Sequence, residues 1–446
     1  MSKEIARGAG WMVLFKIAER SLGLISTIIL ARLLVPADFG LVAMAISVIA
    51  MVEIATAFSF DVMLIHRKAP SQELYNSAWT LNILLGATCA GLSAALAVPA
   101  AAFFNEPRLV AVLLWLALGW LAQGFENIGI VEFRRSMDFA QEFRILVGKK
   151  VVGFVVTVAL AIWLESYWAL VAGTVASKIS GVVLSYAMHP YRPRPSLGAA
   201  RELFTFSVWL LLNNVLVFAT TRLSHFLIGR ALGPTPLGLY TVGSEVANLP
   251  TTELVSTINR AVFPGLARMS NDVEGMRKTY LDVTGVIAAF SFPAAAGLAA
   301  VATPVVTLVL GTKWLDAVPV IRILAVAGAI TVLSSHNHSA YLALGKSATT
   351  TFIMTARTIA LILGLVVLTQ PYGLQGIAYA ELISVIVMLL CSGPLLFPAL
   401  KVTLSGYLAK ILRPAVAAAE HLHRMEVQRR LRERRAQEAA ARYTHE

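Results

Sequence analysis

Residues 27–45 read TIILARLLVPADFGLVAMA, two apolar stretches joined by a short turn. The first stretch begins near Gly10, and the second continues to about residue 60. Each run has about 20 residues, the length that crosses the ~30 Å hydrocarbon core of a bilayer as a helix. The stretch therefore predicts two membrane helices that are joined by a tight turn.

Apolar blocks of this kind recur along the whole chain. Of its 446 residues, 57% are hydrophobic and 14% are charged, and its mean hydropathy is +0.73. Soluble domains have nearly twice that share of charged residues, so the sequence predicts an all-α, polytopic membrane protein. About twelve spans are expected, at 10–34, 40–60, 77–100, 109–129, 145–164, 167–187, 206–229, 238–259, 281–301, 317–340, 348–369 and 374–397. Pro293 and Pro304 predict a bent or broken ninth span.

The placement of basic residues predicts the orientation. One alternate set of the loops between spans holds fifteen Lys and Arg residues, whereas the opposite set holds only four, Arg32, Arg108, Arg230 and Lys313. By the positive-inside rule the first set is cytoplasmic, which places both termini in the cytoplasm. A net charge of +12 placed in this way argues against a nucleic-acid partner. The basic tail, with RRLRERR at 429–435, is expected to be cytoplasmic and to contact anionic lipid.

The chain repeats itself after 198 residues. The strings ARLLVPADFGL (31–41) and GRALGPTPLGL (229–239) share an arginine, a proline and a glycine at the same spacing. A shift of six spans, an even number, gives parallel repeats related by a pseudo-two-fold axis along the membrane normal. The repeat predicts six-helix bundles at residues 1–200 and 201–400, a tail at 401–446, and a cleft between the bundles. The repeated prolines and glycines are interpreted as structural turn residues.

The sequence also argues against enzymatic function. No extramembrane segment before the tail is long enough for a catalytic domain, and there is no GxxxxGK[ST] loop for ATP. Cys89 and Cys391 lie inside apolar blocks, and the spacing of His336 and His338 does not fit a helical metal site. We therefore expect a transporter without a cofactor or a metal.

The repeated turns also carry a family resemblance. Residues 27–45, HRKAPSQELYNSAWTLNILLG (66–86), HFLIGRALGPTPLGLYTVGSEVANLP (225–250) and INRAVFPGLARM (258–269) resemble the polysaccharide transport family of the multidrug/oligosaccharidyl-lipid/polysaccharide exporter superfamily. The resemblance implies a Wzx-type flippase in the inner membrane of a bacterial cell. Such a protein moves undecaprenyl-diphosphate-linked oligosaccharide from the cytoplasmic to the periplasmic leaflet for surface polysaccharide synthesis, by gradient-driven alternating access. Membrane lipids, a polysaccharide polymerase and a chain-length regulator are the other partners that it implies.

One departure from the family pattern concerns coupling. Many relatives have an Asp just before the LIGR string, where this chain has Ser224 and His225. Two other functions stay open. One is export of small molecules or drugs, as in other branches of the superfamily. The other is a membrane-embedded polysaccharide polymerase, although the large outer loop expected of such an enzyme is missing.

Ionisable residues inside spans are costly and are normally directed into a bundle or a wet cavity. Lys16, Glu19 and Arg20 share one face of the first helix. We expect them to line the cleft, where Lys16 and Arg20 offer positive charge to a diphosphate or an acidic sugar and Glu19 restrains Arg20 or Lys16. The alternative is an internal ion network that fixes helix packing.

The second half of the chain offers matching cations. Arg222 and His225 lie three residues apart on the seventh helix, and Arg322 and Arg357 lie in the second bundle. Arginine binds phosphate oxygens in a bidentate way, so the three arginines are further candidates for the substrate cavity. His225 is a fourth candidate, because an imidazole can carry charge near neutral pH. A packing role is the alternative for each of them.

Single acids in apolar surroundings could couple transport to a gradient. Glu53 and Glu245 are the better candidates for the coupling of protons or ions, with Glu126 and Glu381 as weaker ones. Each acid could instead pair with a nearby arginine.

Overall fold

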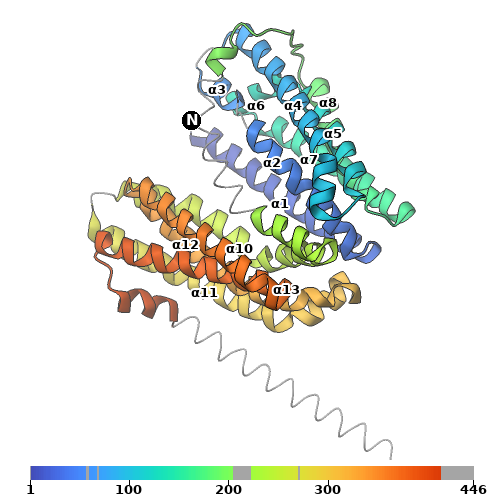
Figure 1. Ribbon diagram of the computed structural model, residues 1–446. Coiled ribbons are helices and arrows are strands. Elements are labelled where there is room, and N and C mark those ends of the chain that lie inside the picture. The colour runs from blue at the N-terminus through green and yellow to red at the C-terminus, as the bar shows by residue number, and fades with distance from the viewer. Residues whose placement is uncertain (1, 57–59, 68–69, 204–221, 270–271, 413–446) are drawn as a thin grey trace, which may run out of the picture. The chain divides into compact units, whose positions relative to one another are not determined.

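The computed structural model describes residues 2–56, 60–67, 70–203, 222–269 and 272–412 (Figure 1). Helices and their connections make up this part of the chain, which contains no strand, and this confirms the all-α class. Most of the predicted seventh span, residues 206–229, and the tail beyond residue 412 lie outside the described residues. The first half contains α1 (Ser2–Leu33), α2 (Pro36–Thr56), α3 (Phe60–His66), α4 (Gln72–Phe104), α5 (Leu109–Gly124), η1 (Ile128–Ile130), α6 (Val131–Arg135), α7 (Phe139–Leu164) and α8 (Trp168–Met188).

The second half begins with a helix over 222–232. It continues with α10 (Pro234–Arg268), α11 (Val273–Val305), the π-helical η2 (Val306–Leu310), η3 (Thr312–Ala317), α12 (Val318–Ala343) and α13 (Ser347–Leu400). A last described helix covers residues 404–412. The ninth predicted span forms α11, which is not interrupted at Pro293; the irregular segment is the π-helix that follows Pro304.

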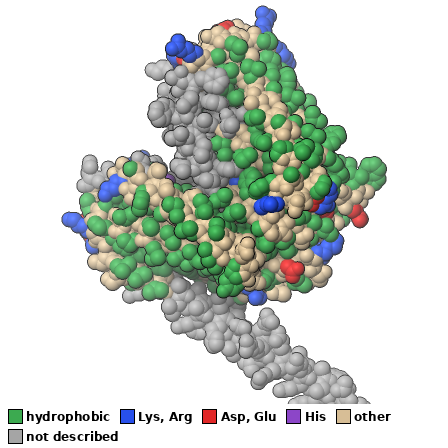
Figure 2. Space-filling model, in the orientation of Figure 1, with side chains coloured by type: hydrophobic (Ala, Val, Ile, Leu, Met, Phe, Trp, Pro, Cys, Tyr) green, Lys and Arg blue, Asp and Glu red, His purple; other side chains and the backbone are tan. Residues whose placement is uncertain are grey.

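The surface of the described helices fits a bilayer. Seven of the described helices are long and apolar enough to cross a membrane, or eight if the bent pair α5 and η1–α6 is one span. Large apolar side chains face outward, for example Trp163 at 79% and Leu308 at 75% exposure. In Figure 2 hydrophobic side chains are spread over the visible surface, and charged side chains are few. The chain is therefore a multi-pass membrane protein, and the count of twelve spans stays a prediction.

The chain forms two compact units. The first contains Met1–Thr241 together with Val309–Lys313, and the second contains Val242–Leu308 and Trp314–Glu446. In the first unit, α7 packs along α8 and α4 along α5. Both pairs meet at glycines, Gly153 with Gly173 and Gly86 with Gly124, where an added Cβ would press on the backbone of the facing helix. Small residues at such crossings let membrane helices approach closely.

Hydrogen bonds bind the core of the second unit. The Tyr280 hydroxyl of α11 donates to Asn337 Oδ1 of α12 at 2.7 Å, and Asn337 Nδ2 donates to Ser392 Oγ of α13 at 2.9 Å. The Tyr341 hydroxyl donates to the Ser392 carbonyl at 2.7 Å. All four side chains are buried, so this network fixes the register of three helices.

The long helix α13 contains the last two predicted spans. Its backbone leaves the helical conformation at Gly373, where φ is 53°. This left-handed φ favours glycine, and it lies between the spans predicted at 348–369 and 374–397.

Candidate functional site

A polar cavity lies inside the first unit, among the membrane helices. It has a volume of about 390 Å³ and is lined by α1, α5, α7 and α8 and by the residues that follow α5. Five ionisable side chains reach it: Glu19, Glu126, Lys149, Lys150 and Lys178. Ionisable groups inside membrane helices are costly unless they are hydrated, paired or in use, and this cavity is the strongest candidate for a binding site.

Glu19 ties α1 to α7 at one side of the polar cavity. Its carboxylate forms ion pairs with Lys16 at 2.9 Å and with Lys150 at 3.3 Å. The Lys16–Glu19 pair is the restraint that the shared face of the first helix led us to expect. Because Glu19 neutralises part of their charge, Lys16 and Lys150 are oriented side chains rather than free cations.

Lys178 joins three helices at the other side of the polar cavity. Its ammonium lies 3.4 Å from the centre of the Trp120 ring and donates a hydrogen bond to Gln123. The Trp120 indole N–H in turn donates to a carboxylate oxygen of Glu53. These contacts link α8, α5 and α2, and they give Glu53 a hydrogen-bond donor that the sequence did not reveal.

The residues at a break in the helix after α5 complete the lining of the polar cavity. The chain bends by 65° between α5 and the η1–α6 segment, and Glu126 lies at this bend. Asn127 fixes the bend: its Nδ2 donates to the Tyr191 carbonyl at 2.7 Å, and its backbone N–H donates to Ser185 Oγ at 2.9 Å. Broken helices commonly line the binding sites of transporters.

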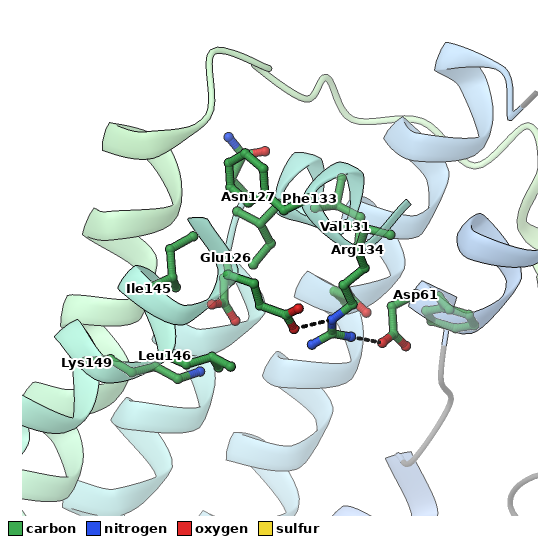
Figure 3. Close-up of a pocket in the computed structure, with 14 residues that line it drawn as sticks. Asp61, Glu126, Asn127, Val131, Phe133, Arg134, Ile145, Leu146 and Lys149 are labelled. Atoms are coloured by element: carbon green, nitrogen blue, oxygen red, sulfur yellow. Dashed lines mark hydrogen bonds and ion pairs between the residues drawn. The ribbon is translucent and has the colours of Figure 1, made fainter. Parts of the chain in front are cut away.

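A second cavity adjoins the bend, with a volume of about 220 Å³ (Figure 3). Arg134 crosses it between two acids, 2.9 Å from Asp61 and 2.5 Å from Glu142. Glu126 and Lys149 line both this cavity and the polar cavity. The two hollows therefore share one wall.

Arg20, the third residue of the predicted cationic face, is half-buried. Its Nε and Nη2 atoms are buried and have no hydrogen-bond partner within the described part of the chain. A buried guanidinium without partners is expensive, so Arg20 keeps its place as a candidate for an anionic ligand.

Arg222 and His225 lie in the helix over 222–232. The His225 ring is edge-on to Tyr240 at 5.7 Å, and its Nδ1 atom is buried without a partner among the described residues. We predicted that Arg222 and His225 line a passage together with α1, and this stays a prediction.

The predicted cations of the second unit are held by their neighbours. Arg322 donates to the Ala299 carbonyl and to Thr303 Oγ1, both at 3.2 Å, and so packs α12 on α11. Arg357 forms an ion pair with Glu381 at 2.7 Å, which is the alternative considered for these residues. Arg357 also borders a cavity of about 220 Å³ between α12 and α13. Glu245 is half-buried in α10.

The histidines of α12 differ in environment. His336 is buried, stacks on Tyr280 with ring centres 4.9 Å apart and forms a hydrogen bond through Nε2 to the Tyr280 carbonyl. His338 borders the cavity at Arg357. The described residues contain no group of three side chains that could hold a metal.

The sequence did not single out the lysines of the polar cavity. Lys149 and Lys150 lie near the start of the apolar block at 145–164, where basic residues are typical of a loop, but both belong to α7. Lys178 stands in the middle of the block at 167–187, where the cost of an intramembrane charge would have marked it.

Comparison with known proteins identifies the family. The sequence profile of the family described as "Polysaccharide biosynthesis protein" matches residues 29–319. The chain belongs to this family. The match confirms the resemblance seen at residues 27–45 and 225–250, and it places this polysaccharide biosynthesis protein among transporters rather than enzymes.

Individual relatives agree with the family. The chain is 27% identical to the lipopolysaccharide biosynthesis protein WzxC of Escherichia coli over 72% of its own length and 66% of that protein. It is 26% identical to the succinoglycan biosynthesis transport protein ExoT of Rhizobium meliloti over 74% of its own length and 67% of that protein. It thus spans about two thirds of these relatives.

A solved structure supports the fold. The lipid II flippase MurJ, in its inward closed conformation, superposes with a TM-score of 0.70 at 15% identity over 91% of each chain. This polysaccharide biosynthesis protein therefore has a MurJ-like fold.

Proposed function

We propose that the protein is a flippase that moves undecaprenyl-diphosphate-linked oligosaccharide from the cytoplasmic to the periplasmic leaflet of the inner membrane. The observation that carries this proposal is the polar cavity, in which three lysines and two glutamates line a hollow inside a bundle of membrane helices. Such a cavity can hold a charged, hydroxyl-rich head group away from lipid, and a prenyl chain can remain in the bilayer. The named relatives act in polysaccharide synthesis, which supports the same class of substrate.

The candidate residues have distinct roles in this proposal. Lys178 and Lys149 offer positive charge to the diphosphate from the wall of the polar cavity, and Glu19 orients Lys150 and Lys16. Arg20, Arg222 and His225 are the further candidates for contact with the head group. Arg322, which packs α12 on α11, and Arg357, which pairs with Glu381, hold the second unit together. Two bundles of six helices, with both termini in the cytoplasm, alternate between inward and outward access.

A gradient drives the cycle in this proposal, and Glu53 and Glu245 are the candidate coupling residues. The Trp120 hydrogen bond to Glu53 means that a proton taken up by Glu53 would change a contact with the polar cavity. A pH gradient applied to reconstituted vesicles is therefore expected to change the transport rate, and Glu53→Gln to reduce that dependence.

The test is reconstitution. Proteoliposomes receive a fluorescent undecaprenyl-diphosphate-linked oligosaccharide, and a membrane-impermeant quencher measures how fast the label leaves the outer leaflet. The protein should accelerate this movement well above protein-free vesicles. If the label stays in place while the same vesicles expel an amphiphilic cation, the protein is a small-molecule exporter and the proposal is wrong.

A further inference from the structure

Arg32 and Arg230 occupy matching positions in the two repeated turns, and each donates to a backbone carbonyl. Arg32 Nε donates to the Val309 carbonyl at 3.2 Å, and Arg230 Nη1 donates to the Phe103 carbonyl at 2.8 Å. All four residues belong to the first unit. The two arginines are thus partnered in the same way.

The Phe103 carbonyl lies at the end of α4, where helical carbonyls lack partners within the helix. The turn that follows provides two amides: Asn105 N–H donates to Ala102, and Glu106 N–H donates to Ala101. Arg230 provides the donor for Phe103, at the negative end of the helix dipole, where a cation is favoured.

The Val309 carbonyl lies at a similar place, at the end of the π-helix η2 and just before a turn. Gly311 makes this turn with a φ of +104°, and an added Cβ there would lie 3.6 Å from the Arg32 guanidinium. The turn therefore packs directly against Arg32.

The donors and acceptors are exchanged between the repeats. Arg32 of the first repeat donates to a turn encoded in residues 201–400, and Arg230 of the second repeat donates to a turn encoded in residues 1–200. Each repeat therefore holds a helix end of the other, so a movement that parts them must break both bonds.

The backbones of the repeated turns also touch. A Cβ on Gly40 would overlap the Pro234 carbonyl, and a Cβ on Gly238 would overlap the Pro36 carbonyl. No side chain, and no sugar, can pass between backbones this close. We call the contact of residues 31–41 with residues 229–239 the seam.

We propose that Arg32 and Arg230 form a clasp that holds the seam closed, and that the clasp opens when the substrate leaves toward the periplasm. This inference rests on the proposed function for its place in the transport cycle. Arg32 and Arg230 belong to the small set of basic residues in the loops assigned to the outer side, which puts the clasp at the periplasmic end. Two exposed hydrogen bonds are strong enough to bias a closed state and weak enough to break in every cycle.

The test uses Met44 as a reporter of the seam. Met44 is fully buried, and its methyl group lies 3.3 Å from the position of a Cβ on Gly229. In a chain with Cys89→Ala and Cys391→Ala, Met44→Cys is labelled with a membrane-impermeant maleimide added from the periplasmic side. The variant Arg32→Ala/Arg230→Ala should raise the labelling rate about tenfold, since the loss of each charge-assisted hydrogen bond favours the open state.

A matched control comes from the same set of outer arginines. Arg108 pairs with Glu106 in its own turn, at 2.8 Å, so Arg108→Ala should leave the labelling rate unchanged. Arg32→Lys/Arg230→Lys, which keeps one donor at each position, should give an intermediate rate and provides the test if the alanine variant does not insert.

The proposal is wrong if Met44→Cys is labelled at the parental rate in the variants of Arg32 and Arg230. It is also wrong if Arg108→Ala raises the labelling rate as much as those variants do. Labelling does not depend on transport. A parental protein that moves no lipid-linked oligosaccharide therefore refutes the proposed function, whereas the labelling result tests the clasp.

Discussion

Lys178 lies with its ammonium 3.4 Å from the centre of the Trp120 ring, between two helices of the first unit. The aromatic face replaces part of the water that a lysine needs, and Gln123 accepts one of its N–H groups. The ring also connects the lysine to Glu53 through its indole N–H. A positive charge is thereby held on the wall of the polar cavity without a direct ion pair to an acid in the described part of the chain.

Replacing this charge should impair transport more than folding. We expect Lys178→Met to lower the flipping rate about tenfold, because a charge-assisted hydrogen bond to the diphosphate, worth about 1.5–3 kcal/mol, is lost, and 1.4 kcal/mol is a factor of ten. Membrane content of the variant, measured by immunoblot, should be unchanged. The control is Lys410→Met, which removes an exposed lysine paired with Asp282; an equal loss in that variant would argue against a role for Lys178 in the cavity.

The unpartnered guanidinium of Arg20 gives a second prediction. Arg20→Ala and Arg222→Ala should each reduce surface polysaccharide about tenfold, because a bidentate phosphate contact is lost. Insertion should stay normal. Arg144→Ala serves as the control, since Arg144 is exposed and donates to Gln141 Oε1 in the same helix at 3.3 Å. Normal polymer output from both cavity variants would remove these arginines from the site.

The connection between α4 and α5 should make stability depend on pH. Arg108 donates to both carboxylate oxygens of Glu106, at 2.8 and 2.9 Å, and this lowers the pKa of Glu106 below its ordinary value of 4.5. A depressed pKa stabilises the folded state above the unfolded pKa, and that stability is lost as the pH falls through the folded pKa. The melting temperature of detergent-purified protein should therefore drop more steeply below about pH 4.5 in the parent than in Glu106→Gln. If the melting temperature falls equally steeply with pH in the parent and in Glu106→Gln, the Arg108–Glu106 ion pair does not contribute to the pH dependence of stability.

Asn337 should be a major determinant of stability in the second unit. Asn337→Ala leaves the Tyr280 hydroxyl without its acceptor and Ser392 Oγ without its donor, at a cost of about 2 kcal/mol or more. The unfolding temperature in detergent should fall by several degrees. Thr355→Ala removes an exposed hydroxyl that bonds its own helix, so it should change the unfolding temperature little. If both variants lower the unfolding temperature equally, the buried network contributes no more to stability than an exposed hydroxyl.

Much of the fold could be predicted because the bilayer imposes it. Apolar length alone located nearly all of the described long helices to within several residues, and the repeated Pro36 and Pro234 begin α2 and α10 as expected for residues that suit a first helical turn. The pairing of Lys16 with Glu19 also followed from spacing, since residues three apart share a helix face.

Long-range contacts could not be predicted in this way. Trp120 bonds to Glu53, 67 positions away, and Arg357 bonds to Glu381 across a kink at Gly373. Periodicity reports which face of one helix is polar, but it does not report which helix that face meets. Only the packing of α7 against α8 shows that Lys149, Lys150 and Lys178 line the same cavity.

The amino-acid sequence by itself determined the all-α membrane class and the family, because hydropathy and the two turn strings are local properties of the chain. The tertiary structure alone decided which charges share a hollow, which acids are already neutralised, and that Arg32 and Arg230 each hold a helix end from the other repeat. The physical reason is that partners of intramembrane charges are chosen by helix packing, and packing brings together residues that lie tens to hundreds of positions apart.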